Sequence, residues 1–141
     1  MPQPTHHFGI AMPYMDYLGV ESISSCAERT ITRLNWSPQL CNARGELHGG
    51  ALMSVLDYSL SAAGRAQRPG YGMATIEMQT QFLSPGKGNL TIEATCLSQD
   101  KDLLICRAQA FDQRQRLIAS ATATLKPVKF KPEPSSLRAS A

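Results

Sequence analysis

The residues best suited to chemistry lie in one stretch, where Asn42 precedes the triplet His48-Gly49-Gly50 and Asp57 follows it. The first N–H groups of a helix have no internal partner, and glycine leaves them uncovered, so a helix beginning at Gly49 could donate to an oxygen brought close. Asp57 would lie about two turns inside that helix, too deep to cap its start. A carboxylate in such a place has either a partner or a chemical role.

These groups depend on one long helix, which the sequence predicts from about Gly49 to Ala66. Ala, Leu, Met and Val dominate the segment, and no proline interrupts it before Pro69. At about 3.6 residues per turn, small apolar residues form a stripe that could press closely onto a sheet, whereas Asp57 lies in a small, mostly neutral groove. The stripe contains Leu52, Val55, Leu56, Ser59, Ala62, Ala63 and Ala66, and the groove contains Gly50, Met53, Ser54, Leu60, Ser61 and Gly64.

Four stretches after the helix alternate apolar and polar residues with a period of two, which predicts an antiparallel sheet with one apolar face. A turn centred on Lys101 would place Cys96 opposite Cys106, so that two neighbouring strands share that face. The four stretches are residues 74–82, 90–96, 104–110 and 117–125. In the first stretch, the residues predicted on the apolar face are Ala74, Ile76, Met78 and Phe82.

Two further elements are predicted before the long helix. Residues 12–19 suggest a short helix, with Pro13 in its first turn and Gly19 at its end. Residues 20–36 are rich in β-formers and predict one extended segment with a bend or bulge near Ser24-Ser25.

Length and composition favour a single domain. At 141 residues the chain can bury a core, and a net charge of +3 does not indicate a nucleic-acid partner. No apolar stretch approaches the roughly 18 residues that span a membrane, and the N-terminus does not resemble a secretory signal, so we expect a cytoplasmic protein. The four cysteines have no metal-binding spacing and are expected to be small, buried and reduced. They are Cys26, Cys41, Cys96 and Cys106.

Taken together, the motifs resemble the hotdog-fold acyl-CoA thioesterases, in particular the phenylacetic-acid-degradation (PaaI-like) branch. The match runs from about Met12 to Leu125, and the resemblance implies an α+β hotdog fold in which a curved antiparallel sheet wraps one long central helix. We assign residues 1–126 to this domain and residues 127–141, which are rich in Pro and Ser, to a flexible tail. The motifs that carry the resemblance are Asn42, His48-Gly49-Gly50, Asp57, Ala74-Thr75-Ile76-Glu77-Met78 and Phe82-Leu83-Ser84-Pro85.

The resemblance implies hydrolysis of an acyl- or aryl-acyl-CoA thioester to a free acid and CoA, without a metal or bound cofactor. An attacked thioester carbonyl becomes an oxyanion, so the reaction needs positioned donors and an activated nucleophile. The Gly49 N–H would be the oxyanion donor, and Asp57 would act as general base on water or attack the carbonyl itself. In the resembled family, an amide at the position of Asn42 orients the thioester or the water, and a hydroxyl at the position of Thr75 steadies the nucleophile. His48 would hydrogen-bond the loop or the substrate.

Each of these residues also has a structural explanation. The glycines could serve only a tight entry into the helix, Asn42 could be a turn residue, and Thr75 could be a strand threonine that faces away from the helix. Asp57 could be a buried carboxylate bonded to a nearby hydroxyl group. The candidate hydroxyl groups belong to Ser54, Tyr58 and Ser61. A Ser-His-Asp triad is not expected, since it would have to use His48 and no nucleophile-elbow motif accompanies that residue.

In the resembled enzymes two sheets pair edge to edge in a dimer, and each site takes its Asp from one subunit and its HGG and Asn segment from the other. We therefore expect a homodimer or a dimer-of-dimers tetramer with no nucleic-acid or membrane partner. Further substrate-binding candidates are Gly50, Met53, Lys87 and Lys101, the two lysines as contacts for the polyanionic CoA. A non-catalytic acyl-CoA binding or sensing module on the same fold is the alternative. The sequence leaves open whether the acyl group is aryl or fatty.

Overall fold

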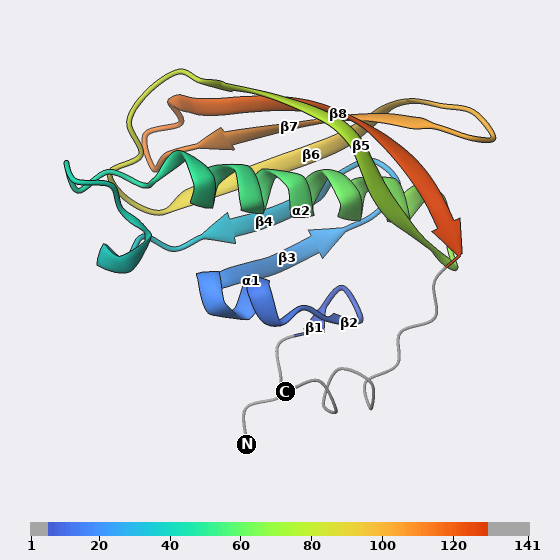
Figure 1. The fold of residues 1–141 in the computed structure, drawn as a ribbon, viewed down its shortest axis with the longest axis horizontal. Helices are drawn as coiled ribbons and strands as arrows, with labels where there is room; N and C mark the ends of the chain where they lie inside the picture. The colour runs from blue at the N-terminus through green and yellow to red at the C-terminus, as the bar shows by residue number, and fades with distance from the viewer. Residues whose placement is uncertain (1–5, 130–141) are drawn as a thin grey trace.

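One long helix inside a curved antiparallel sheet dominates the computed structural model, which describes residues 6–129 (Figure 1). The predicted arrangement of helix and sheet is confirmed. In chain order the elements are β1 (His6–His7), β2 (Ile10–Ala11), α1 (Pro13–Leu18), β3 (Val20–Ser25), β4 (Thr30–Leu34), the 3₁₀ turn η1 (Pro38–Leu40), α2 (Gly49–Gln67), β5 (Tyr71–Phe82), β6 (Leu90–Gln99), β7 (Leu104–Phe111) and β8 (Leu117–Lys129).

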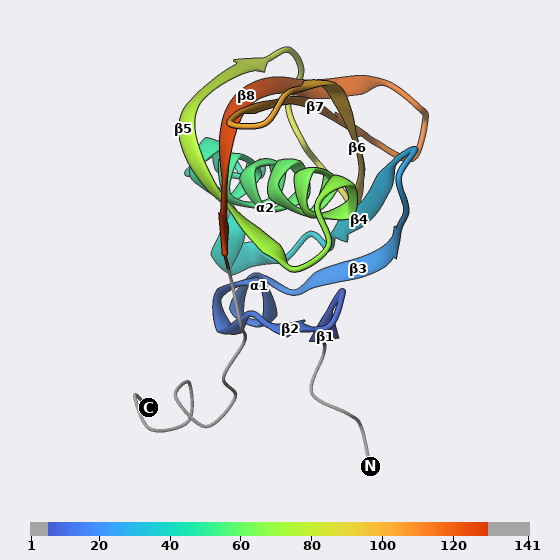
Figure 2. The ribbon, with the colours of Figure 1, turned by 90° about the vertical axis from the view of Figure 1, so that its right-hand side faces the viewer.

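The main sheet has six strands in the order β3-β4-β6-β7-β8-β5, which leaves β3 and β5 at its edges. The strands curl around α2, and β1 and β2 form a small separate sheet below β3 (Figure 2). The core lies between α2 and the concave face of the sheet, where buried alanines of β7 and β8 let the helix approach closely. These alanines include Ala108, Ala110, Ala119, Ala121 and Ala123.

Helix α2 begins at the predicted residue and ends one residue after the predicted end. Burial extends further around it than expected, because Leu60 and Gly64, which we assigned to the open groove, are buried. A Cβ atom on Gly64 would lie 3.0 Å from the Met73 side chain and 3.1 Å from that of Leu125, so glycine allows β5 and β8 to pass close to the helix. The open part of the groove is therefore shorter than predicted, and it is centred on the partly exposed Asp57.

The β6–β7 hairpin has the predicted register, with Cys96 opposite Cys106 and Ala94 opposite Ala108. Burial raises the pKa of the Cys106 thiol to about 12, so this side chain stays protonated and packs as a small hydrophobic group. All four cysteines are free thiols. Cys26 contradicts the prediction of burial, because it is exposed beside the turn that follows β3.

The extended segment predicted over residues 20–36 is a hairpin rather than one strand. The N–H of Cys26 donates to the carbonyl of Arg29 at 3.0 Å and closes the turn between β3 and β4. A bulge between Ser22 and Ser24 interrupts β3, which confirms the bend or bulge predicted near Ser24-Ser25. The prediction of a single segment was wrong because β-formers on both sides of a short polar turn gave one continuous pattern.

Strand β5 departs from strict alternation at a bulge between Thr75 and Glu77. Thr75 pairs with the buried Leu125, which places the Thr75 side chain on the helix side of the sheet. The predicted apolar face is therefore wrong at two positions, since Ala74 pairs with an exposed lysine and Ile76 is the bulged residue, 58% exposed.

The short helix predicted near the N-terminus is present, and two boundaries need correction. Residues up to about Gly9 were expected to be loose, but His6–His7 form strand β1, which pairs with β2. Helix α1 has its proline in the first turn and ends at Gly19, whose φ of 74° is the left-handed conformation of a helix C-cap. Strand β8 continues through Pro127 to Lys129, so the domain extends three residues beyond the boundary predicted at residue 126. The remainder of the predicted tail lies outside the described residues.

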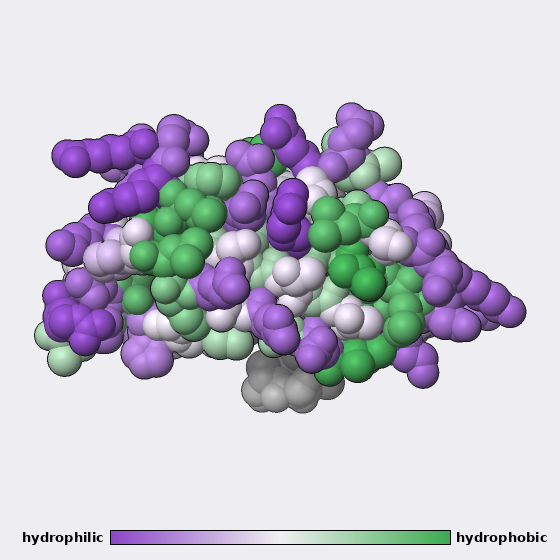
Figure 3. All heavy atoms as spheres, turned by 90° about the horizontal axis from the view of Figure 1, so that it is seen from above, coloured by the Kyte–Doolittle hydropathy of each residue, from purple (hydrophilic) through white to green (hydrophobic). Residues whose placement is uncertain are grey.

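The face of the molecule seen from above has polar side chains around its margin and separate apolar patches between them (Figure 3). Large exposed apolar side chains lie on the edge strand β5 and on the central strands β6 and β7. They include Ile76, Phe82, Leu97 and Ile105. The edge strand thus carries apolar side chains that this chain alone does not cover.

Candidate active site

The start of α2 has one amide that is already bonded and one that is not. His48 is the N-cap residue, and its Nδ1 accepts a hydrogen bond from the Gly50 N–H at 2.8 Å. The first bond within the helix runs from the Leu52 N–H to the His48 carbonyl at 3.1 Å. Within residues 6–129, the Gly49 N–H has no hydrogen-bond partner. Gly49 is therefore the available donor, whereas the amide of Gly50, predicted as a substrate-binding residue, is engaged by His48.

Asn42 shapes the loop that leads to this helix. Its Oδ1 accepts from the N–H groups of Arg44 at 2.9 Å and Glu46 at 3.2 Å, so its carbonyl oxygen has the turn-forming role that we gave as its structural explanation. Its side chain also lines a cavity of about 380 Å³ together with Gly49 and Phe82. The ring of Phe82 covers Gly49, since a Cβ atom on that glycine would lie 3.4 Å from it.

The second group of predicted residues meets in the middle of α2. The Thr75 hydroxyl donates to Asp57 Oδ1 at 2.7 Å, across the contact between β5 and the helix. Two of the hydroxyl groups proposed as alternative partners bond elsewhere, because Ser54 Oγ donates to the Gly50 carbonyl at 2.9 Å and Tyr58 OH lies 2.8 Å from Ser22 Oγ. The explanation of Thr75 as a strand residue that faces away from the helix is wrong.

Two cavities open beside Asp57. The smaller, of about 260 Å³, is bounded by Met53, Thr75 and Met78. The larger, of about 370 Å³, extends along the other side of the Asp57 carboxylate toward α1. The lining residues of the larger cavity include Met12, Tyr14 and Met15 of the α1 region. The carboxylate is thus bonded to a hydroxyl and still reachable from two sides.

The two halves of the predicted site do not meet within one chain. Gly49 and Asp57 are separated by eight residues of a regular helix, a rise of about 12 Å along its axis. They also line different cavities, Gly49 the one with Asn42 and Asp57 the two described above. One carbonyl carbon cannot be within hydrogen-bonding reach of both groups of the same chain.

A buried histidine network was missed by the sequence analysis. His7 is 0% exposed, and its ring nitrogens lie 2.7 Å from Ser22 Oγ and 2.8 Å from Asp16 Oδ1. The expectation that any Ser-His-Asp grouping would use His48 was therefore wrong. Ser22 also contacts the OH of Tyr58, whose pKa burial raises to about 12. The network joins β1, α1, β3 and α2, and no pattern in the sequence pointed to it because its members lie on four separate elements.

The predicted basic residues lie at opposite ends of the molecule. Lys87 lines a cavity of about 370 Å³ with Arg114 and Arg116, between the β5–β6 loop and the β7–β8 turn. Lys101 lies on the β6–β7 turn, where Arg68 at the end of α2 donates to its carbonyl at 3.2 Å. This is the end of the helix opposite Gly49 (Figure 1). Arg114 and Arg116 were not predicted, although their spacing in one turn was visible in the sequence.

Two further observations concern cofactors and membranes. Within residues 6–129, no three His, Cys, Asp or Glu side chains converge as a set of metal ligands. In the same part of the chain, neither α-helix is long and apolar enough to cross a bilayer.

Comparison with known proteins identifies the family. The family model of the thioesterase superfamily matches residues 44–119, more than half of the chain, and the protein therefore belongs to that superfamily. SSO1253 of Saccharolobus solfataricus, a protein that carries the name of an esterase, is 30% identical over 110 residues, which cover 77% of this chain and 73% of that protein. The protein is accordingly an enzyme of the thioester-hydrolase class.

Solved structures agree on the fold. The PaaI protein of the Escherichia coli phenylacetic acid degradation operon is 21% identical with a TM-score of 0.81, and the match covers 93% of this chain and all (100%) of that one. The protein smu.793 of Streptococcus mutans, solved with acetyl CoA bound, is 20% identical with a TM-score of 0.73, covering 81% of this chain and 91% of that one. The predicted hotdog fold and the resemblance to thioesterases are confirmed, and the fold is similar to that of the PaaI protein.

Proposed function

We propose that the protein is an acyl-CoA thioesterase that uses Asp57 and the Gly49 N–H as its reacting groups. The observation that carries the proposal is the bond between Thr75 and an Asp57 carboxylate that remains open to two cavities. The unbonded amide at the start of α2 adds an oxyanion donor of the required kind. The acetyl CoA bound to the Streptococcus mutans protein supports CoA as the carrier of the acyl group.

Hydrolysis on these groups follows one of two routes. In the first, Asp57 takes a proton from water as the water oxygen attacks the carbonyl carbon, and the Gly49 N–H donates to the oxyanion that forms. Collapse of this intermediate breaks the C–S bond, and the leaving thiolate takes a proton to give CoA and the free acid. In the second, the carboxylate attacks the carbonyl carbon, the C–S bond breaks and CoA leaves as the thiolate, which takes a proton. Water then hydrolyses the mixed anhydride to the free acid and restores the Asp57 carboxylate. In both routes Thr75 holds the carboxylate in position.

Two copies of the chain are needed to assemble this site. About 12 Å along α2 separates the two groups, which requires Gly49 and Asn42 from one subunit and Asp57 from the other. The exposed apolar side chains of β5, with Ile76 58% and Phe82 52% exposed, supply the edge at which a homodimer would form. A dimer of such dimers would keep the same site.

The binding residues divide between the acyl group and CoA. Met53 lies beside Asp57 and Thr75, so it would contact the acyl group near the scissile bond. Lys87 would attract the phosphates of CoA together with Arg114 and Arg116, because their cavity and the Gly49 cavity both adjoin the β5–β6 loop. Lys101 could take part only where a neighbouring subunit brings its turn to the site.

A thiol-release assay tests the proposal. We expect saturable turnover with at least one ester from a panel of acetyl-, hexanoyl-, palmitoyl- and phenylacetyl-CoA. The same esters should be titrated by calorimetry, using a non-hydrolysable thioether analogue of each. Binding of an analogue without turnover of any ester would contradict the proposal and favour the alternative, a non-catalytic acyl-CoA binding or sensing module.

A further inference from the structure

The larger cavity beside Asp57 runs along α2 and ends at Arg65. Its volume of about 370 Å³ is within the range of small-molecule sites. The side walls are mainly apolar, whereas the charged side chains among its lining residues are Asp57 and Arg65. Those two residues are eight positions apart on one helix, a separation of about 12 Å along the axis. The apolar lining residues are Ile10, Met12, Met15, Met73 and Val128.

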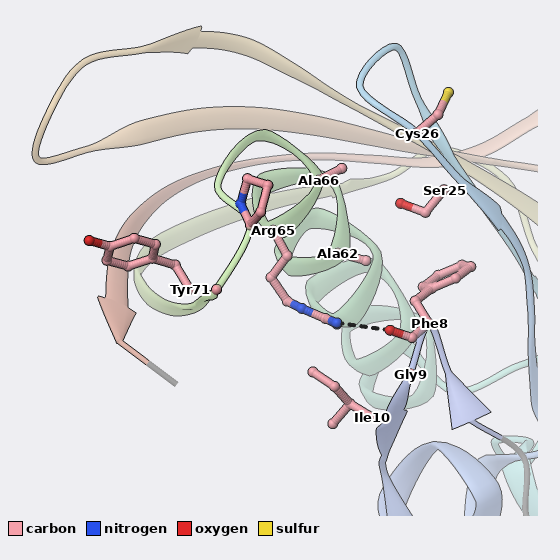
Figure 4. A pocket seen from close by; sticks show the side chains of 11 residues that line it. Phe8, Gly9, Ile10, Ser25, Cys26, Ala62, Arg65, Ala66 and Tyr71 are labelled. Carbon is pink, nitrogen blue, oxygen red and sulfur yellow. Dashed lines mark hydrogen bonds between the residues drawn. The ribbon is translucent and has the colours of Figure 1, made fainter. Parts of the chain in front are cut away.

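Arg65 is a half-buried cation with unused donors. One of its terminal nitrogens donates to the Phe8 carbonyl at 3.1 Å, and no carboxylate within residues 6–129 lies at ion-pair distance from it. Arg65 also lines a second cavity, of about 450 Å³, with Phe8 and Tyr71. Figure 4 draws that second cavity and shows the guanidinium group pointing toward the Phe8 carbonyl, with Ile10 nearby. Burial lowers the pKa of Arg65, which nevertheless stays a cation at neutral pH. A guanidinium group has five N–H donors, so the contact with Phe8 leaves donors for a ligand.

Charge is therefore distributed unevenly along the cavity. An acyl group whose carbonyl reacts at Asp57 and whose chain enters this cavity would extend along α2, so that its far end would approach Arg65. A second negative charge close to Asp57 would be repelled, whereas one at the far end would meet a cation in a mainly apolar surrounding. A carboxylate fits best because guanidinium pairs with it through two parallel hydrogen bonds.

We propose that Arg65 binds the terminal carboxylate of a dicarboxylic acyl group, so that the preferred substrates are ω-carboxyacyl-CoA thioesters of short to medium length. This inference rests on the proposed function, because it places the scissile carbonyl at Asp57. Thioester hydrolysis does not by itself require this class of substrate, so the inference goes further than the proposed function. Arg65 is the residue that distinguishes such an ester from the monocarboxylic ester of equal length.

Matched pairs of esters test the inference without any mutation. Glutaryl-CoA is compared with pentanoyl-CoA, and adipoyl-CoA with hexanoyl-CoA, by kcat/KM from thiol release. We expect the dicarboxylic ester to be preferred in at least one pair by about 10-fold to 100-fold, which corresponds to a charge-assisted hydrogen bond. Equal turnover within both pairs, or preference for the monocarboxylic esters, would overturn the inference. Absence of turnover with all four esters and with the wider panel would instead overturn the proposed function.

Variants then assign the preference to Arg65. Arg65→Gln should reduce the dicarboxylic-to-monocarboxylic ratio about 10-fold or more, while Arg65→Lys, which keeps the charge, should retain part of it. Arg107→Gln removes a cation from the exposed face of β7 and should leave the ratio unchanged. An Arg65→Gln variant that loses activity equally on both members of a pair would place Arg65 in CoA binding or in folding and would contradict the inference. Thermal unfolding of each variant checks the fold.

Discussion

The start of α2, around Gly49, and the middle of α2, around Asp57, are held in place in different ways. At the start of the helix, residues close in sequence hold one another, because Asn42 closes the turn around Glu46 and His48 caps Gly50. In the middle of the helix, Asp57 depends on Thr75, eighteen positions later, and on the bulge that turns Thr75 toward the helix. The start of α2 is thus held by contacts between neighbours in sequence, whereas the Asp57 region is held by a tertiary contact between α2 and β5.

The difference explains why each region alone is incomplete. The start of α2 offers the Gly49 N–H as a donor and the side-chain amide of Asn42. The one carboxylate that lines the Gly49 cavity belongs to Glu46, and it is paired with Arg44. The middle of α2 offers a carboxylate and a hydroxyl beside two cavities. If both regions serve one reaction, substitutions in either region should lower turnover, by loss of the oxyanion donor at the start of α2 and by loss of the carboxylate or its position in the middle.

The largest effect is expected from the carboxylate. Asp57→Asn keeps the size of the side chain and removes its charge, so turnover should fall by about 10²-fold to 10⁴-fold in the thiol-release assay. Asp102→Asn, a change in an exposed turn, is the matched control. Unchanged turnover in Asp57→Asn would remove this residue from the chemistry.

The start of the helix can be tested by removing one N–H group. Proline is tolerated at the first position of a helix, so Gly49→Pro should keep the fold and lower kcat by roughly 10²-fold to 10³-fold through loss of the oxyanion donor. Gly49→Ala keeps the N–H, and its Cβ would meet Phe82 at an ordinary 3.4 Å, so this variant should stay active. Equal loss in the two variants would indicate a steric effect instead.

The edge strand connects the two regions across subunits. Ile76→Glu places a charge at an exposed position of β5, which should leave folding intact while it weakens the dimer and lowers turnover at least about tenfold. Ile105→Glu makes the same change on the central strand β7 and should keep the dimer. Sedimentation velocity and circular dichroism measure assembly and folding. A folded monomer of Ile76→Glu with full activity would contradict a shared site.

The smallest effect is expected from the hydroxyl that positions the carboxylate. Thr75→Val removes the 2.7 Å bond to Asp57 and should lower kcat about tenfold, whereas Thr75→Ser should keep most of the activity. Because Thr75 acts through Asp57, its loss should shift the pH profile of kcat. A Thr75→Val variant with the activity and pH profile of the natural enzyme would show that the bond has no positioning role.

The sequence predicted what depends on local pattern. Helical composition located α2 within one residue, and the alternation of β6 and β7 gave their register, because burial of one face fixes it. It could not predict the bulge beside Thr75, since one extra residue reverses the faces of a strand without a clear signal. The contacts of His7 and Arg65 join separate elements of the fold, and no periodicity in the sequence reports these contacts.

Mixing two inactive variants tests the shared site most directly. Asp57→Asn and Gly49→Pro subunits, unfolded together and refolded as mixed dimers, form one site with both groups intact in each heterodimer. Random pairing should therefore restore about a quarter of the activity of the natural enzyme. A mixture that stays as inactive as its two components, with heterodimers demonstrated by mass spectrometry, would contradict a site built from two chains.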